Sequence, residues 1–386
     1  MQYVIFILIF FVFAKAETFD EIVSRIDNNP YILSNKSLVE SYEGEIIKAK
    51  SFSNPDGYIQ FGRLVGGNSS ATITEFYISQ PLKLYNQRKY NIESAVSEKL
   101  YQSLQFDSFK RKYLSVLYQS FYEALYNKEL LKIAENEANL SKEFFNFTEK
   151  VYKLREASKL DFLKAQREYQ LSISKLNQQK LLYLESLKSL SSLVGYEIKD
   201  VEGDFYHVRD IKTIDFLSLP EIKSFDEKIR SLQALEKYYK ALSYPQISVG
   251  VIAKEYSNDK YESGLVVNFT LPVFYRNLGE IVSVKNQKAS YTSLKDYTVN
   301  SLKIKYSSIL ESYKSDLDLI SQLNESIETA KNELNLAEKS YKLKTISLFE
   351  FFNIKALYFE TLKYKLEIYK NLHQLYSKYL EIGGSL

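Results

Sequence analysis

The sequence predicts a mainly α-helical protein with short β hairpins, in which one structural unit occurs twice. Glycine and proline, which interrupt regular structure, number only 12 and 6 among 386 residues. Short runs of alternating apolar residues lie between long stretches that contain neither. Several landmarks recur in the same order about 190 positions later, which is the mark of an internal repeat.

Three pairs of landmarks carry the duplication, at offsets of 190, 190 and 189 positions. They are NP at 54–55 and YP at 244–245, YN at 85–86 and YR at 275–276, and YKLREASKLD at 152–161 and YKLKTISLFE at 341–350. We therefore expect two structural repeats, 17–200 and 201–386, each with a helix, a β hairpin and a pair of long helices.

The N-terminus has the pattern of a secretory signal. An apolar run from Tyr3 to Phe13 precedes Ala14-Lys15-Ala16, a small-x-small cleavage site, so we expect residues 1–16 to be a signal peptide. The run is too short to span a bilayer as a helix, which needs about 20 residues. The rest of the chain has no second apolar stretch of that length, and this excludes a helical membrane protein.

Composition excludes several functions. The chain has no cysteine, which excludes disulfides and thiolate metal sites. Its 51 basic and 48 acidic residues nearly cancel, so no nucleic-acid surface is expected. His207 and His373 stand alone, which suggests packing or surface roles. Without a nucleophile elbow, phosphate loop or metal-ligand cluster, we expect no catalytic residue, cofactor or metal, and no enzyme activity.

The elements follow the same order in both repeats. The expected helices are 18–50, 86–154 and 158–194, then 221–242, 280–343 and 347–380, and the expected strands are 57–66, 71–81, 246–256 and 262–271. Alternation is clearest in the second repeat, where Ile247, Val249, Val251 and Ala253 share one face of a strand. The helix at 86–154 would be about 100 Å long.

The helix expected at 158–194 carries apolar residues at coiled-coil spacing and ends at Gly195. These residues are Phe162, Ala165, Tyr169, Ile173, Leu176, Tyr183, Leu187, Leu190 and Val194. Both this helix and the one at 347–380 start with a serine followed by an acid three residues later. Ser158 with Asp161, and Ser347 with Glu350, are therefore predicted to form capping boxes.

The length of the predicted strands is compatible with a protein that spans a membrane. Four strands of about ten residues are long enough to cross a bilayer when tilted. Four cannot close a barrel, and open edges are not tolerated in lipid, so two or three chains would have to pool eight or twelve strands. The alternative is a non-pore periplasmic coiled-coil protein whose hairpins form a soluble cap.

The order of elements resembles the TolC family of outer-membrane efflux proteins, and two strand-to-helix passages carry this resemblance. The segment ISQPLKLYNQR at 78–88 resembles the first passage of the family, and LVVNFTLPVFY at 265–275 resembles the second. The resemblance covers essentially the whole chain after the signal. It implies a homotrimer with a twelve-stranded β-barrel in outer-membrane lipid and an α-helical barrel in the periplasm.

For function, the resemblance implies a passive conduit in a tripartite efflux system, which takes small molecules from an inner-membrane pump and a periplasmic adaptor protein. A type I protein-secretion conduit would use the same architecture. The non-pore coiled-coil protein differs from both in class.

The resemblance also assigns residues to a gate at the periplasmic tip. Tyr341 and Asp161 match a tyrosine and an acid that bond across copies, and Glu350 matches an acid of the constriction. Asn353 stands where a second acid is usual, so half of the fixed negative charge is expected. A ring of acids there would attract cations.

Adaptor docking is assigned to the two helix–helix turns. The first comprises Arg155, Glu156, Ala157 and Ser158, and the second comprises Lys344, Thr345, Ile346 and Ser347. Arg155 and Lys344 replace the glycines usual in the family, and Ile346 replaces an arginine. The segment 196–220 would connect the repeats as a belt around the tunnel.

Overall fold

The computed structural model describes residues 16–66, 69–257 and 259–386. These residues form long helices and one antiparallel sheet of four strands, which confirms the predicted fold class. The expected signal peptide, 1–16, lies outside the described residues except for Ala16. None of the described helices is both long enough and apolar enough to cross a membrane.

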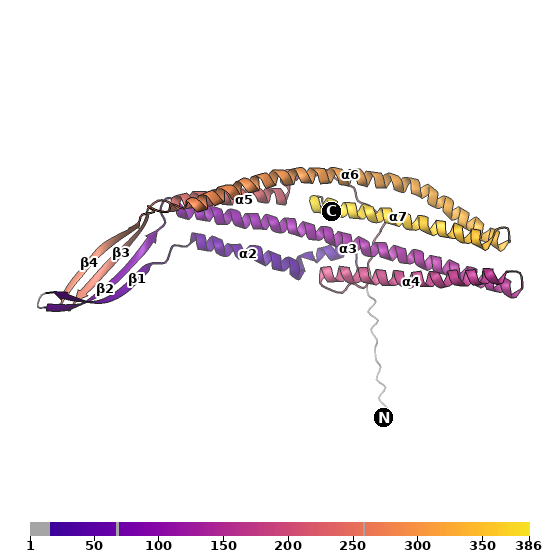
Figure 1. Ribbon diagram of the computed structural model, residues 1–386, viewed down its shortest axis with the longest axis horizontal. Helices are drawn as coiled ribbons and strands as arrows, with labels where there is room; N and C mark the ends of the chain where they lie inside the picture. Colours follow the sequence, from indigo (N-terminus) through magenta and orange to yellow (C-terminus); the bar gives the residue numbers. More distant parts are fainter. Residues whose placement is uncertain (1–15, 67–68, 258) are drawn as a thin grey trace, which may run out of the picture. The chain divides into compact units, whose positions relative to one another are not determined.

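The order of a helix, a hairpin and two long helices occurs twice (Figure 1). The elements are α1 (Phe19–Ser24), η1 (Ile26–Asn28), α2 (Pro30–Lys50), β1 (Asp56–Gly66), β2 (Ser69–Leu82), α3 (Gln87–Lys153) and α4 (Lys159–Val194), then η2 (Phe216–Ser218), α5 (Pro220–Leu242), β3 (Gln246–Tyr256), β4 (Lys260–Thr270), α6 (Leu278–Lys342) and α7 (Leu348–Ile382). The repeat boundary at 200/201 stays a prediction.

Contacts divide the chain into two compact units. Unit 1 contains the described residues within Met1–Leu33, Phe109–Ile214 and Leu302–Leu386, and unit 2 contains those within Ser34–Ser108 and Asp215–Ser301. In unit 2, α5 packs on the first part of α3, where Lys228 Nζ lies 2.9 Å from Glu98 Oε2.

The helix expected at 18–50 is interrupted, and Pro30 explains the break. The residue before a proline is pushed out of the helical region, and Asn29 accordingly has φ −65° and ψ 128°. Its side chain then caps another helix. Asn29 Nδ2 donates to the carbonyl oxygens of Leu193 (3.3 Å) and Val194 (2.9 Å) at the end of α4.

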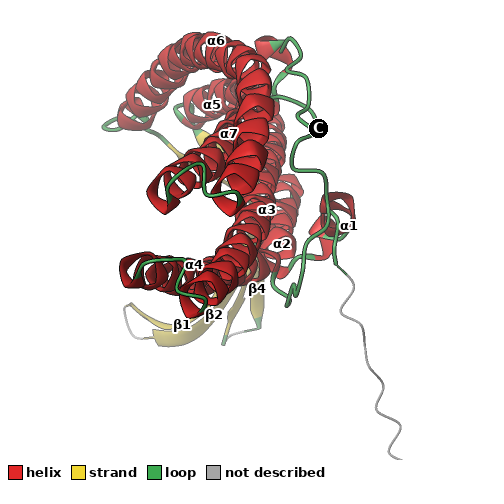
Figure 2. Ribbon diagram, turned by 90° about the vertical axis from the view of Figure 1, so that its right-hand side faces the viewer, coloured by secondary structure: helices red, strands yellow, loops and turns green. Residues whose placement is uncertain are grey.

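In unit 1 the later part of α3 pairs with α4, and α6 pairs with α7 (Figure 2). None of the residues predicted for the coiled-coil seam of α4 is exposed. Aromatic side chains fill much of the space between helices. Phe145 of α3, for example, stacks on Tyr169 of α4 with ring centroids 5.7 Å apart.

The segment after Gly195 runs along unit 1 and is held by side chains. Tyr313 OH donates to the carbonyl oxygen of Arg209 (2.6 Å), and Lys128 Nζ lies 2.7 Å from Asp200 Oδ1. A belt around a tunnel, which the resemblance implies for 196–220, stays a prediction.

His373 of α7 is a core residue with an exposed fraction of 2%. Its Nε2 donates to the carbonyl oxygen of Phe205 (2.9 Å), so Nδ1 accepts from Tyr118 OH (2.9 Å). The ring stacks on Tyr122 at 3.8 Å. Burial lowers the pKa of His373 to about 4, so the ring is neutral in the folded protein.

This buried histidine makes stability depend on pH. An unfolded histidine titrates near pH 6.5, so below that pH the unfolded chain binds a proton that the folded chain does not. The free energy of unfolding should therefore fall by up to about 1.4 kcal/mol per pH unit from pH 6.5 down to about 4. Denaturant titrations should show that this slope is lost in His373→Gln and kept in His207→Gln, which changes an exposed histidine. An unchanged slope in His373→Gln would contradict the assignment.

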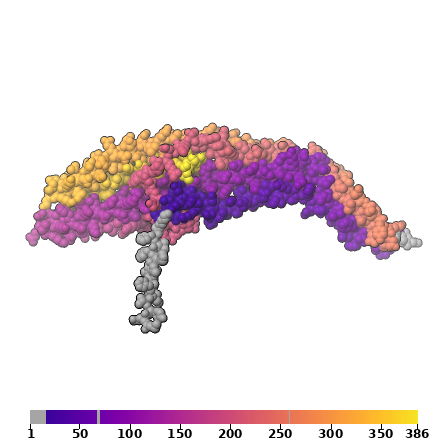
Figure 3. Space-filling view, turned by 180° about the vertical axis from the view of Figure 1, so that it is seen from behind, coloured from indigo at the N-terminus to yellow at the C-terminus, as the bar shows by residue number. Residues whose placement is uncertain are grey.

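The sheet of unit 2 has the strand order β1-β2-β3-β4, and all pairs are antiparallel. The central pair joins the two repeats, since Ile78 of β2 is opposite Val251 of β3. In the space-filling view, the described helices of unit 2 leave the visible face of the strands uncovered (Figure 3).

The two faces of the sheet differ in chemistry, as the alternation predicts. Directly opposite pairs such as Val249 and Val267, and Val251 and Leu265, place large apolar side chains on one face. This apolar face includes Ile59, Phe61, Phe76, Ile78, Val249, Val251, Leu265, Val267 and Phe269, all of which are exposed. Leu265 is 83% exposed.

The opposite face, called here the polar face, carries charged and hydroxyl groups. One row across the four strands reads Gln60, Glu75, Lys254 and Glu262. Lys254 Nζ lies 3.3 Å from Glu75 Oε2, and Tyr256 OH donates to Glu262 Oε2 at 2.9 Å. The sheet therefore has one mainly apolar surface and one mainly polar surface.

Candidate functional site

The helix–helix turns that sequence analysis assigns to the tip share one backbone structure. In the first turn the N–H of Arg155 donates to the carbonyl oxygen of Tyr152, and that of Glu156 to Val151, both at 2.9 Å. The second turn has the same two bonds at 2.9 Å, from Lys344 to Tyr341 and from Thr345 to Ser340. This pair of bonds is the Schellman motif, which satisfies the last carbonyl groups of a helix.

The motif explains why glycine is expected at two of these positions. Arg155 has φ 61° and Lys344 has φ 63°, both in the left-handed region. Glycine adopts this region freely, whereas this backbone conformation costs a residue with a Cβ atom about 1–2 kcal/mol. The Lys344 side chain makes a contact that glycine could not make. Its Nζ lies 2.8 Å from Glu156 Oε2, so an exposed ion pair links the two turns.

Arg155→Gly should therefore stabilise the protein by about 1 kcal/mol, because the strain disappears while the turn is kept. Thermal unfolding in detergent measures this. Arg167→Gly is the matched control, since Arg167 lies inside α4 and glycine there should cost about 1 kcal/mol. Equal destabilisation by both changes would show that Arg155 is not strained.

Both N-terminal caps after the turns form, but only one capping box is complete. Ser347 Oγ accepts from the N–H of Glu350, and Glu350 Oε2 accepts from the N–H of Ser347 (2.9 Å). At the first turn Ser158 Oγ accepts from the N–H of Asp161 (3.0 Å), while the carboxylate of Asp161 accepts from the Ser158 hydroxyl. Of the capping box predicted for Ser158 and Asp161, the bond to the serine hydroxyl forms, but the bond from the carboxylate back to the backbone N–H of Ser158 does not. Aspartate is one methylene shorter than glutamate and does not reach this N–H.

Tyr341 and Asp161 lie near each other without a direct bond in the described chain. The Tyr341 hydroxyl lies 3.3 Å from Thr148 Oγ1 of α3, and its ring packs on Phe351 at 5.9 Å. Burial raises the pKa of the Tyr341 hydroxyl, and the charge of Asp161 raises it further. The hydrogen bond with Thr148 lowers this pKa and offsets part of the increase. Tyr341 is therefore a neutral hydroxyl beside a carboxylate.

Glu350 and Asn353 are both exposed at the start of α7. The N–H and the hydroxyl of Ser347 lower the pKa of Glu350, so it is ionised at neutral pH. Ile346, which replaces an expected arginine, packs against a buried cluster that includes Phe351. Of the remaining turn residues, Ala157 is half-buried and Thr345 is exposed, with Thr345 Oγ1 donating to the carbonyl oxygen of Ser340 (2.9 Å).

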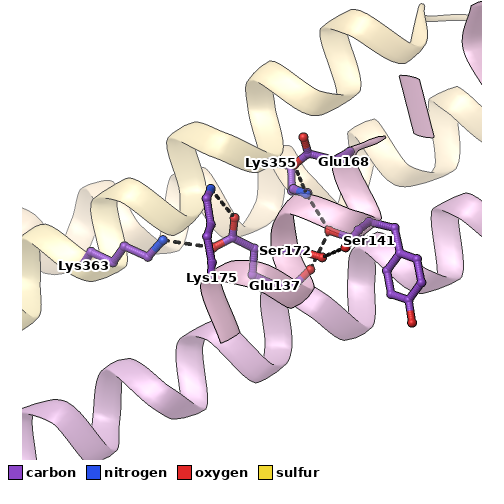
Figure 4. Close-up of polar contacts among 8 residues, drawn as sticks. Glu137, Ser141, Glu168, Ser172, Lys175, Lys355 and Lys363 are labelled. Atoms are coloured by element: carbon purple, nitrogen blue, oxygen red, sulfur yellow. Dashed lines mark hydrogen bonds and ion pairs between the residues drawn. The ribbon is translucent and has the colours of Figure 1, made fainter. Parts of the chain in front are cut away.

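A charged network around Lys355 inside unit 1 was not predicted from the sequence (Figure 4). Its members come from α3, α4 and α7, which no local motif connects. A signal was available on α7, because Lys355 lies one helical turn from Phe351 and from Phe359, which are both buried. A lysine on the apolar face of a helix predicts a buried, paired charge.

Comparison with known proteins supports the fold. No family profile and no curated protein matches the sequence. A structure of CusC, from work on its folding and transmembrane channel formation, matches with a TM-score of 0.80 at 16% identity over 95% of this chain and 92% of that chain. The outer membrane protein VceC of Vibrio cholerae matches with a TM-score of 0.79 at 11% identity over 95% of this chain and 96% of that chain. The open state of the outer membrane channel MtrE of Neisseria gonorrhoeae matches with a TM-score of 0.78 at 12% identity over 95% of this chain and 89% of that chain. The chain therefore has the TolC-like fold that the resemblance predicts.

Proposed function

We propose that this chain is one protomer of a homotrimeric outer-membrane channel. It would be a passive conduit through the periplasm, without catalysis, for small molecules delivered by an inner-membrane pump and a periplasmic adaptor. The observation that carries this proposal is the exposed apolar face of the sheet. The fold shared with outer-membrane channels supports it.

The apolar face has the properties of a lipid-facing surface. It is contiguous across all four strands, whereas soluble monomers rarely expose large apolar patches. Nearer the hairpin loops the same face carries Arg63 and Glu255, where lipid headgroups would begin. The polar face would then line a water-filled lumen. A non-pore coiled-coil protein would instead need polar residues on both faces.

The edges of the sheet favour association. β1 and β4 are the outer strands in the described chain, and each has one side without a partner strand. Lipid does not tolerate open edges, so β4 of one copy would pair with β1 of the next. Three copies would pool twelve strands. The helices favour association too, because α4 exposes apolar side chains that a neighbouring copy would cover, namely Leu160, Leu163, Leu171, Leu181, Leu182 and Leu184.

The gate would lie at the two turns. Tyr341 has a neutral hydroxyl and Asp161 a carboxylate, which suits a hydrogen bond between neighbouring copies. Three Glu350 carboxylates, one per copy, would form a negative ring that attracts cations. The exposed turns, including Arg155 and Lys344, would meet the adaptor.

If Asp161 closes the gate, Asp161→Ala should raise the conductance of the closed channel in a planar bilayer, because the proposed bond to Tyr341 of the neighbouring copy would be lost. Asp210→Ala, which removes an exposed acid far along the chain, is the control and should leave the closed level unchanged. An unchanged closed level in Asp161→Ala would remove Asp161 from the gate.

The location is tested by separating the inner and outer membranes on a density gradient. We expect the protein in the outer-membrane fraction, released only by detergent. Recovery as a soluble periplasmic protein would overturn the proposal.

A further inference from the structure

One buried lysine connects three helices of unit 1 (Figure 4). Lys355 of α7 has an exposed fraction of 1%. Its Nζ donates to Ser141 Oγ of α3 and to Glu168 Oε1 of α4, both at 2.8 Å. The ammonium group also lies 5.5 Å from the ring centroid of Phe352. A charge at this depth is tolerated only because each of these groups is in place.

A second layer of the same network centres on Glu137 of α3, which is 6% exposed. It accepts from Lys175 of α4 (3.3 Å) and from Lys363 of α7 (2.9 Å). Burial opposes ionisation of Glu137, but the bonds and charges of the two lysines outweigh it and lower its pKa. The Ser141 hydroxyl donates to the carbonyl oxygen of Glu137 (2.7 Å), so the two layers are continuous.

Apolar contacts lie next to this network on α7. Phe351 stacks on Phe144 of α3 with centroids 3.7 Å apart, and Phe359 is buried one turn beyond Lys355. Apolar contacts are not directional, so a packed helix could slip by one turn, about 5.4 Å, and bury a similar area. After such a slip the Lys355 ammonium would lose its hydrogen bonds to both oxygen partners, Ser141 Oγ and Glu168 Oε1. A single buried polar residue is known to fix register in this way.

We infer that Lys355 fixes the axial register of α7 against α3 and α4, and is thereby a positioning residue for the gate. Asn353 and Glu350 lie on α7 within five positions of Lys355, while Asp161 lies on α4 seven positions before Glu168. The register of α7 against α4 therefore sets the positions of Glu350 and Asp161 relative to each other along the helix axes. The exposed pair of Lys344 and Glu156 contributes too little to do this. The gate role rests on the proposed function, but the register itself does not.

The test uses the absence of cysteine, which lets two spin labels be placed without competition. Labels at Arg167 of α4 and Glu360 of α7, both exposed, report the register as a distance distribution. Dilution with unlabelled chain isolates the distance within one copy. We expect one narrow peak in the parent, and in Lys355→Met a broadened distribution or a second peak displaced by about 5 Å. Lys153→Met is the matched control, since Lys153 pairs with Glu149 within α3 and should leave the peak unchanged.

A narrow peak at the parent distance in Lys355→Met would overturn the inference. If that variant does not fold, Glu168→Gln keeps the shape of the partner and removes its charge. It should broaden the peak, and an unchanged peak would overturn the inference equally. Broadening in a protein that conducts no ions would support the register role and reject the proposed channel, so the two failures can be told apart.

Discussion

Val267→Lys should abolish recovery of the assembled protein from the membrane. Val267 lies on the apolar face of β4, directly opposite Val249, and 57% of it is exposed in the single chain. If this face contacts lipid, a lysine near the bilayer midplane costs about 2–4 kcal/mol per site. A trimer carries three such sites. The measurement is the yield of oligomer on native gels after extraction of outer membranes.

The matched control for Val267→Lys is Gln60→Lys. Gln60 is also exposed, but it lies on the polar face, opposite Glu75. A lysine there would enter the proposed lumen, and the oligomer should form at the parent level. If Val267→Lys assembled as well as Gln60→Lys, the apolar face would not be in lipid.

Gly250→Ala should disrupt the sheet between β2 and β3, the pair that joins the two repeats. A Cβ atom at Gly250 would lie 2.3 Å from the carbonyl oxygen of Ile78 and 2.7 Å from Ser79 Cβ. Because one obstacle is backbone, the strands themselves would have to move apart. Overpacking of this kind typically costs about 1–3 kcal/mol. We expect loss of the assembled oligomer, measured on native gels after extraction of outer membranes.

Gly264→Ala separates this effect from the general effect of losing a glycine. Gly264 of β4 lies on the same polar face, opposite Ile252. Its added Cβ would meet Ile252 Cγ2 at 3.8 Å, an ordinary contact. This variant should be neutral or slightly stabilised, because alanine restricts the unfolded chain. Equal tolerance of both alanines would mean that β2 and β3 do not approach as closely as described.

Much of the fold could be predicted because its signals are local. Low glycine and proline content predicted the long helices, and alternation predicted β3 to its observed bounds, Gln246–Tyr256. The break at Asn29 was not predicted, although Pro30 is a local signal for it. The pairing of β2 with β3 joins residues far apart in sequence, and periodicity alone does not identify partners.

The candidate site was predictable in part for the same reason. The turns and their serine caps are local, and the structure has them at the expected positions. The left-handed φ of Arg155 and Lys344 was signalled only by the glycines that the resemblance leads one to expect there, because neither residue itself favours this region. The partners of Lys355 were hidden because Ser141 and Glu168 come from two other helices. Whether Tyr341, Asp161 and Glu350 act as a gate stays a prediction.

The proposed trimeric channel is tested most directly by the mass and conductance of the purified, detergent-extracted protein. We expect a trimer that opens long-lived, cation-preferring channels in a planar bilayer, since each copy would add one Glu350 carboxylate to the proposed constriction. A monomer or dimer that is stable without detergent and shows no conductance would contradict the proposal.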